Sequence, residues 1–162
     1  MAKIISFAKA CELSKKFRHE GKKVVFTSGC FDILHIGHMV FFKKIRKLFG
    51  AKTILFLGVE SDKYIKLRKG ENRPIFSQKI RVEVMSMLTV IDYVIKLTFT
   101  TDYKKRYQKI NPNYITFGNN EFINTIRKDT KELQIGFKHL PHKIKKSSTS
   151  KIVNILLDNF SS

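Results

Sequence analysis

Cysteine and long hydrophobic runs are scarce in this sequence, and each scarcity excludes a class of protein. Cysteine occurs only as Cys11 and Cys30, which is too few for a disulfide framework and gives no metal-ligand spacing. No apolar run approaches the roughly 20 residues that span a bilayer. Lys3 and Lys9 bracket only a short apolar patch at the N-terminus, so no signal-peptide pattern is present. These absences predict a soluble, cytoplasmic protein without a membrane partner.

Acidic residues are scarce as well. Against 32 Lys and Arg stand only 13 Asp and Glu, which gives a net charge of +19. Such an excess suits polyanionic partners, from nucleotides to nucleic acid. A compositional bias that leaves solvated lysines over the whole surface explains the same number. The sequence contains no helix-turn-helix, zinc-finger or RNP pattern, so nucleic acid is not the expected partner.

The chain also lacks internal repeats and linkers, which predicts a single domain over residues 1–162. Apolar runs predict strands, and apolar residues at helical spacing predict helices. One predicted strand begins at Val24, and the other four cover 53–59, 93–95, 114–117 and 136–140. The predicted helices cover 5–20, 39–49, a short segment ending at 69, 77–88, 103–110, 122–134 and a closing segment at 151–160. This alternation predicts an α/β fold, a doubly wound Rossmann-like parallel sheet of about five strands with ligands at their carboxyl ends.

The most informative stretch runs from Val24 to His38. A buried strand breaks into a small-residue turn at 28–30, and a helical pattern takes over after Gly37. Such units bind phosphate in α/β proteins, because backbone N–H groups and the positive end of the helix dipole converge on the anion. His35 and His38 project from one face of the first helical turn, where two imidazoles can grip a phosphate. Gly37 leaves room for a ligand to come close.

Six residues of this stretch form a spaced pattern, Gly29-x-Phe31-Asp32-x-x-His35-x-Gly37-His38. This pattern resembles the signature of the cytidylyltransferase-like nucleotidyltransferases. The string 26–35 is most similar to the heptose-phosphate adenylyltransferase branch, which also carries a helix ahead of the signature strand. The resemblance covers roughly residues 6–157. It implies a nucleotidyltransferase, and a homodimer is usual in this family.

The resemblance assigns further residues to the site. Lys69-Gly70-x-x-Arg73-Pro74 and then Arg81 resemble the family's segment around the phosphates, where rigid guanidinium forks suit phosphate oxygens. Ser148 and its neighbours resemble a Ser/Thr element at a helix start. The residues implied for catalysis are His35, His38 and Lys69. Those implied for nucleotide and phosphate binding are Gly29, Cys30, Phe31, Gly37, Lys43, Arg73, Arg81, Gly118, Asn119, Asn120, Ser147, Ser148 and Thr149. Plain surface charges and helix caps are the alternative reading of these arginines and hydroxyls.

Two positions leave roles open. Gly118-Asn119-Asn120 departs from the family, in which many relatives have Gly-Gly-Asp or Gly-Asp-Asp near the nucleotide. Asparagine still accepts a hydrogen bond but carries no charge, so we expect looser discrimination between ATP and CTP. Asp32 is either a turn-stabilising residue or one with a metal-linked or loop-ordering role.

The resemblance implies direct transfer, in which a sugar-phosphate oxygen attacks the α-phosphorus of a nucleoside triphosphate in line and pyrophosphate leaves. The histidines would donate to phosphate oxygens, with Lys43 or Lys44 and Lys69 as further cations. The resemblance also implies Mg²⁺, which is expected to bridge the phosphates and to be held mostly by substrate and water. The chain has no dedicated carboxylate cluster for a metal, in keeping with this expectation. A heptose 1-phosphate is the expected acceptor. The alternatives are cytidylyl transfer to glycerol 3-phosphate, adenylyl transfer to FMN, and a degenerate fold that binds nucleic acid.

Overall fold

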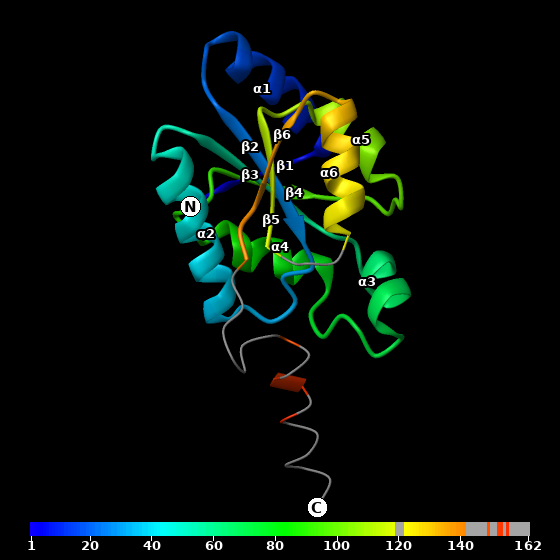
Figure 1. Cartoon of the computed structure of the whole chain (residues 1–162). Helices are drawn as coiled ribbons and strands as arrows, with labels where there is room; N and C mark the ends of the chain where they lie inside the picture. Colours follow the sequence, from blue (N-terminus) through cyan, green and yellow to red (C-terminus); the bar gives the residue numbers. More distant parts are fainter. Residues whose placement is uncertain (119–121, 142–148, 150–151, 154, 156–162) are drawn as a thin grey trace, which may run out of the picture.

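The structure, a computed structural model, is organised around one parallel β-sheet. It describes residues 1–118, 122–141, 149, 152, 153 and 155. Six strands pair in the order β1-β4-β3-β2-β5-β6 (Figure 1). They are β1 (Lys3–Ile5), β2 (Val24–Gly29), β3 (Ile54–Val59), β4 (Tyr93–Lys96), β5 (Tyr114–Phe117) and β6 (Gly136–His139).

The strand order reverses at β2. From β2 the chain moves outward to β3 and β4 on one side, and it later returns to build β5 and β6 on the other. Val25 of β2 lies level with Leu55 of β3 and with Tyr114 of β5, so β2 is paired along both edges. In doubly wound folds such a reversal creates a crevice at the carboxyl ends of the strands, where ligands bind.

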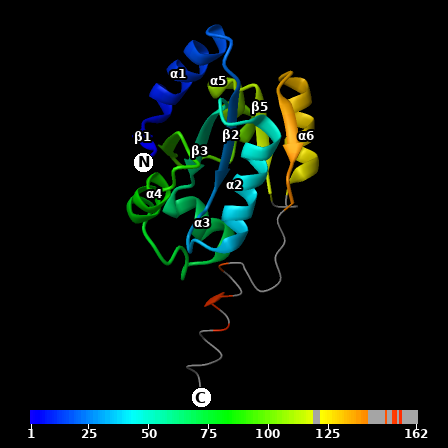
Figure 2. The ribbon, with the colours of Figure 1, turned by 90° about the vertical axis from the view of Figure 1, so that its left-hand side faces the viewer.

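Helices cover both faces of the sheet (Figure 2). Those in the described part of the chain are α1 (Phe7–His19), α2 (Ile36–Phe49), α3 (Asp62–Lys69), α4 (Gln78–Ser86), α5 (Tyr103–Ile110) and α6 (Ile123–Glu132). On one face α2 and α4 pack Phe42 and Met85 against the strands. On the other face α1, α5 and α6 contribute Ala10, Tyr107 and Ile126.

The central strands are buried along most of their length because helices cover them on both sides. β2 is buried from Val24 to Ser28, and β3 is buried from Leu55 to Val59. A one-sided sheet would instead alternate apolar and polar residues. The continuous runs in the sequence therefore predict this arrangement, and the expected parallel α/β fold is confirmed.

The sheet has one strand more than the five located in the sequence, because β1 lies at one edge of the sheet. The helix expected from residue 5 begins at Phe7, and Ser6 caps it by accepting a hydrogen bond from the Lys9 backbone at 3.1 Å. Of the closing helix expected at 151–160, positions 152, 153 and 155 are helical, and its other positions lie outside the described residues.

The amino ends of the strands are held together by side chains. Arg46 of α2 donates through Nη1 to the Thr53 carbonyl at 2.6 Å and through Nη2 to Asp92 Oδ2 at 2.8 Å. Asp92 also accepts from the Leu55 backbone N–H at 2.6 Å. This network occupies the end of the sheet opposite the crevice. None of the helices in the described ranges is long and apolar enough to cross a membrane.

Candidate active site

The turn between β2 and α2 lies at the carboxyl end of the central strand. Gly29 ends β2, and the Phe31 ring lies so close that a Cβ atom on Gly29 would be 2.9 Å from two ring carbons. Phe31 itself has a φ of 47°, which non-glycine residues rarely adopt. Its buried ring meets the His38 ring edge-on at 5.2 Å between centroids. The glycine therefore permits a backbone course that brings Phe31 against the histidines.

His35 and His38 stack on each other at the start of α2. Their ring centroids are 3.8 Å apart and their planes differ by 25°. The His35 backbone N–H donates to His38 Nδ1 at 3.4 Å, and the His38 backbone N–H donates to the His35 carbonyl at 2.9 Å. Gly37 is buried within the same turn. Both imidazoles thus lie at a helix N-terminus, where the dipole and the first N–H groups favour an anion.

Asp32 organises the loop that precedes α4. Its carboxylate accepts from Arg73 Nε at 2.8 Å and from the backbone N–H groups of Ile75 at 2.9 Å and Phe76 at 3.0 Å. Burial would raise the pKa of Asp32, but the hydrogen bonds from Phe76, Ile75 and Arg73 outweigh it and hold the pKa below its ordinary value. Both carboxylate oxygens are engaged by protein donors, which favours the loop-ordering role over the metal-linked one.

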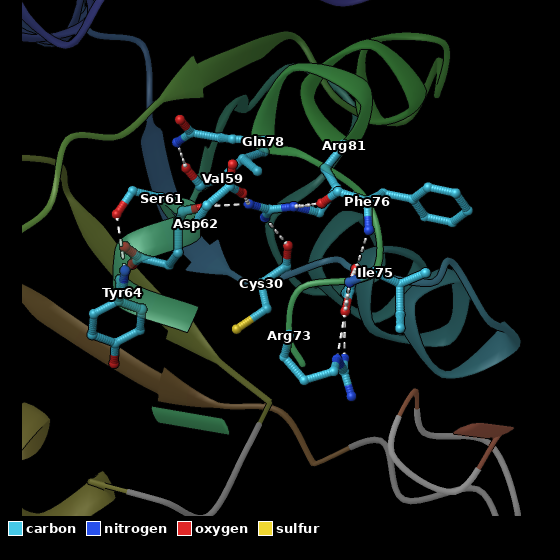
Figure 3. Close-up of polar contacts among 12 residues, drawn as sticks. Cys30, Val59, Ser61, Asp62, Tyr64, Arg73, Ile75, Phe76, Gln78 and Arg81 are labelled. Atoms are coloured by element: carbon cyan, nitrogen blue, oxygen red, sulfur yellow. Dashed lines mark hydrogen bonds and ion pairs between the residues drawn. The ribbon is translucent and has the colours of Figure 1, made fainter. Parts of the chain in front are cut away.

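Arg81 has a different environment from the one expected of a phosphate ligand. It is 1% exposed, and its guanidinium faces inward among backbone carbonyls (Figure 3). Nε donates to the Phe76 carbonyl at 2.9 Å, Nη2 donates to the Glu60 carbonyl at 2.8 Å, and Nη1 donates to the Cys30 carbonyl. Nη2 also pairs with Asp62 at 2.8 Å. In this geometry Arg81 holds the signature turn against β3 and α3, and the expected phosphate-binding role stays a prediction.

The predicted lysines occupy different places around the turn. Lys69 ends α3, and its charge reaches the Cys30 side chain: burial raises the pKa of the Cys30 thiol, and Lys69 is the strongest of the charges that oppose this effect. Lys43 is exposed on α2. Lys44 Nζ donates to the Pro141 carbonyl after β6, so this cation supports the chain at that point. The charge of Lys69 thus acts on the signature turn.

Thr149 connects the C-terminal part of the chain to the signature turn. It is 7% exposed, and its hydroxyl lies 3.4 Å from the Ile33 backbone nitrogen and 3.3 Å from the Ile33 carbonyl oxygen. The structure therefore brings one member of the predicted Ser/Thr element beside the histidine turn. Gly118 directly follows β5, the strand that pairs with β2. Asn119, Asn120, Ser147 and Ser148 lie outside the described residues.

Two supporting contacts were not predicted from the sequence. Glu60 and Arg106 form a buried ion pair at the end of β3, with 2.7 Å between Oε1 and Nη1. Gln78 of α4 donates from Nε2 to the carbonyls of Val59 at 2.9 Å and Leu97 at 2.7 Å, which joins the ends of β3 and β4. A glutamate directly after an apolar strand is the one signal for the first contact. Nothing in the sequence distinguishes Gln78 from a surface residue.

Among the side chains that the structure describes, no group of three or more His, Cys, Asp or Glu residues is arranged to hold a metal ion. The turn offers imidazoles, a helix N-terminus and Lys69, all of which suit an anion. Such a site fits a metal ion that arrives with a polyphosphate better than one bound by protein carboxylates.

The chain is also similar in sequence to known proteins. The family model described as "Cytidylyltransferase-like" matches residues 26–158. The protein "Bifunctional protein HldE" of Syntrophotalea carbinolica is 34% identical over 144 residues, which is 88% of this chain and 29% of that protein. The protein of the same name from Aliarcobacter butzleri is 40% identical over 101 residues, which is 62% of this chain and 21% of that protein. The chain thus spans less than a third of the length of these relatives.

Two solved structures share the fold. A lipopolysaccharide core biosynthesis protein from Thermoplasma volcanium has a TM-score of 0.62 and 29% identity, and the match covers 75% of this chain and 96% of that one. Pantoate-beta-alanine ligase from Francisella tularensis has a TM-score of 0.66 at 11% identity, and the match covers 98% of this chain and 77% of that one. At that identity the second likeness concerns the fold alone.

Proposed function

Because the chain belongs to the cytidylyltransferase-like family, as its signature predicts, and is a nucleotidyltransferase, we propose that it transfers the adenylyl group of ATP to a heptose 1-phosphate. The observation that carries this proposal is the stacked pair of His35 and His38 at the start of α2, beside the crevice where the strand order reverses. The choice of acceptor rests on the likeness of residues 26–35 to the heptose-phosphate branch. The "HldE" relatives and the lipopolysaccharide core biosynthesis protein agree with that choice.

The proposed chemistry needs no covalent enzyme intermediate. A phosphate oxygen of the sugar attacks the α-phosphorus, a new P–O bond forms opposite the bond that breaks, and pyrophosphate leaves. His35 and His38 would donate hydrogen bonds to phosphate oxygens at the N-terminus of α2. Lys69, at the end of α3, would neutralise charge on the leaving pyrophosphate. Mg²⁺ enters as part of the nucleotide substrate and screens its charge.

Asp32, Arg73 and Arg81 have a supporting role in this proposal. The Asp32–Arg73 pair holds the 73–76 loop, and Arg81 holds the carbonyls of Cys30 and Glu60. A preorganised turn costs no reorganisation when charge develops on the phosphates, which is where electrostatic catalysis gains its rate. We propose that these residues keep the histidines in place and do not touch the substrate.

A substrate matrix tests the proposal. Purified protein with Mg²⁺ is given ATP or CTP together with heptose 1-phosphate, glycerol 3-phosphate or FMN, pyrophosphate release is followed, and the products are identified by mass. We expect release with ATP and heptose 1-phosphate, and its loss in His38→Ala. Turnover of CTP with glycerol 3-phosphate, or of ATP with FMN, would reject the acceptor but keep the nucleotidyltransferase. A chain inert with every pair would count against the whole proposal.

A further inference from the structure

One edge of the sheet is formed by β6, and in the described part of the chain no further strand lies beside it. β6 is the last strand in the order of the sheet and pairs with β5 alone, and Figure 2 shows it (orange) next to α6. The Gly136 N–H donates to the Asn113 carbonyl at 3.0 Å, and the Leu140 N–H donates to the Phe117 carbonyl at 2.8 Å. Both of these bonds run toward the β5 side of the strand.

The backbone groups of the residues between these two donors face outward. Successive residues of a strand direct their N–H and C=O groups to opposite sides, so Phe137 and His139 direct theirs away from β5. A row of outward donors and acceptors is a template on which an extended segment of another chain can pair. The outer side of residues 136–139, which we call the β6 edge, can therefore take one more strand.

A groove lies between β6 and the second half of α6. It encloses about 380 Å³, which is within the range of ligand clefts, and buried Ile135 and half-buried Phe137 contribute apolar surface to it. His139 lines the groove as well, and the buried Nε2 atom of its ring has no hydrogen-bond partner among the residues that the structure describes. Buried polar atoms are rarely left unpaired. The groove thus offers an added segment both apolar contacts and a polar group.

The charged side chains that line the groove are all cations. They are Arg127 and Lys131 of α6 and Lys138 of β6, and within the described ranges none of the three forms an ion pair. The acidic Glu132 of the same helix pairs with Lys104 of α5 instead. A lysine on an edge strand repels a second basic strand, whereas an acidic strand gains from all three cations. The charge therefore selects an acidic partner.

From the outward backbone groups and the cations beside them, we infer that the β6 edge binds an extended acidic segment of another protein by strand addition. Side chains of the added segment alternate between the two faces of the sheet. Those on the face where Phe137 packs reach Arg127 and Lys131, and those on the other face reach Lys138. Nucleic acid is anionic too, but its phosphates only accept hydrogen bonds and cannot pair with the outward carbonyls. The edge therefore favours a peptide.

Fluorescence anisotropy with a labelled peptide of alternating Glu and Val residues tests the inference without any substrate. We expect saturable binding that weakens as salt is added. The same peptide with every backbone nitrogen methylated should bind at least about tenfold more weakly, because it has lost the N–H donors that strand addition needs. A peptide of alternating Lys and Val is the charge control and should not bind. Absence of saturable binding by the Glu peptide overturns the inference, and so does equal affinity of its methylated form.

Amide hydrogen exchange locates the bound peptide on the chain. The N–H groups of Phe137 and His139 should exchange at least about tenfold more slowly in the complex, because they then donate to the peptide. The N–H groups of Gly136 and Leu140 already donate to carbonyls on the β5 side and should change little. Binding that leaves the exchange of Phe137 and His139 unchanged would mean that the cations attract the peptide without strand pairing, and it overturns the inference.

Charge reversal in the groove separates local contacts from the charge of the whole chain. Arg127→Glu with Lys131→Glu, both exposed, should raise the peptide dissociation constant by at least about tenfold. Lys15→Glu with Lys16→Glu on α1 is the matched control, since it changes the net charge equally and lies outside the groove. Equal effects of the two double variants overturn the inference. So does a single-stranded oligonucleotide of equal charge that binds as tightly as the peptide, because the groove would then accept polyanions in general. None of these results depends on the proposed reaction.

Discussion

His35 and His38 hold each other in place, because each ring forms one side of the other's stacking contact. We predict that His35→Ala and His38→Ala, made separately, lower kcat by roughly two to four powers of ten, the range for loss of one preorganised donor to developing charge. Steady-state kinetics with the best substrate pair gives the measurement. His19→Ala is the control, since His19 is an exposed residue in the last turn of α1. Turnover near the wild-type rate in either site variant would remove that histidine from the mechanism.

A second prediction concerns Asp32 and the stability of the folded protein in acid. Its pKa is held below the ordinary value in the folded chain, so its stabilising effect is present above the pKa of the unfolded chain, about 3.9, and is lost as pH falls through the lower folded value. The free energy of unfolding, from urea titrations, should therefore fall more steeply below about pH 4 in the wild type than in Asp32→Asn.

At neutral pH, Asp32→Asn should lower the free energy of unfolding by about 3–5 kcal/mol, because it leaves the buried Arg73 charge without its partner. Glu12→Gln provides the control, since Glu12 pairs with Lys9 on the exposed side of α1, where an ion pair contributes at most about 1 kcal/mol. Parallel pH curves for the wild type and Asp32→Asn would contradict the assignment of the acid-sensitive step to Asp32.

At the scale of elements, α4 joins the signature turn to β3 through the fork of Arg81. Lysine keeps the charge but has no rigid fork, so it cannot reach the carbonyls of Phe76, Glu60 and Cys30 together. We predict that Arg81→Lys lowers the free energy of unfolding by about 3 kcal/mol, because buried carbonyls lose their donors. Arg18→Lys is the matched control, since exposed Arg18 has one carbonyl partner, that of Asn111, at 2.9 Å. An Arg81→Lys variant of unchanged stability but raised nucleotide KM would return this residue to phosphate binding.

Most elements were predictable because their signals are local. A continuous apolar run such as β3, or a helix capped by a serine such as α3, is visible within ten residues of sequence. β1 is different: it has three residues, and its existence depends on pairing Lys3 with Tyr93, ninety positions away. The inward orientation of the Arg81 side chain also depends on contacts between distant residues, since its partners come from three separate segments. Within the site, the histidines and Gly29 carry a recognisable pattern, whereas Gln78 and Glu60 gain their roles only from the packing of α4 and α5.

At the scale of the whole molecule, the net charge of +19 should raise the local concentration of the proposed polyanionic substrate around the chain. We predict that kcat/KM for the nucleotide falls by about tenfold between low and high salt while kcat changes little, because the Debye length shrinks from about 10 Å at 0.1 M to about 3 Å at 1 M. Initial rates at several salt concentrations give both constants.

Reversing the charge of two lysines far from the signature turn shows whether the salt dependence comes from the charge of the whole chain or from local contacts. Lys15→Glu with Lys16→Glu, on exposed positions of α1, should reduce the salt dependence and leave kcat unchanged. An unaltered salt dependence in that double variant would mean that the lysines around the rest of the surface reflect composition and do not attract the substrate.

The bond between Thr149 and Ile33 joins positions that are 116 residues apart. In chain order β2 and the histidine turn come before β3, but the hydroxyl that meets Ile33 comes after all six strands. The supporting loop at 73–76 and the clamp from Arg81 arrive in between. Contacts of long sequence separation form late because loop closure must come first. The hydrogen bond between Ile33 and Thr149 therefore forms only after the residues of all six strands have been made.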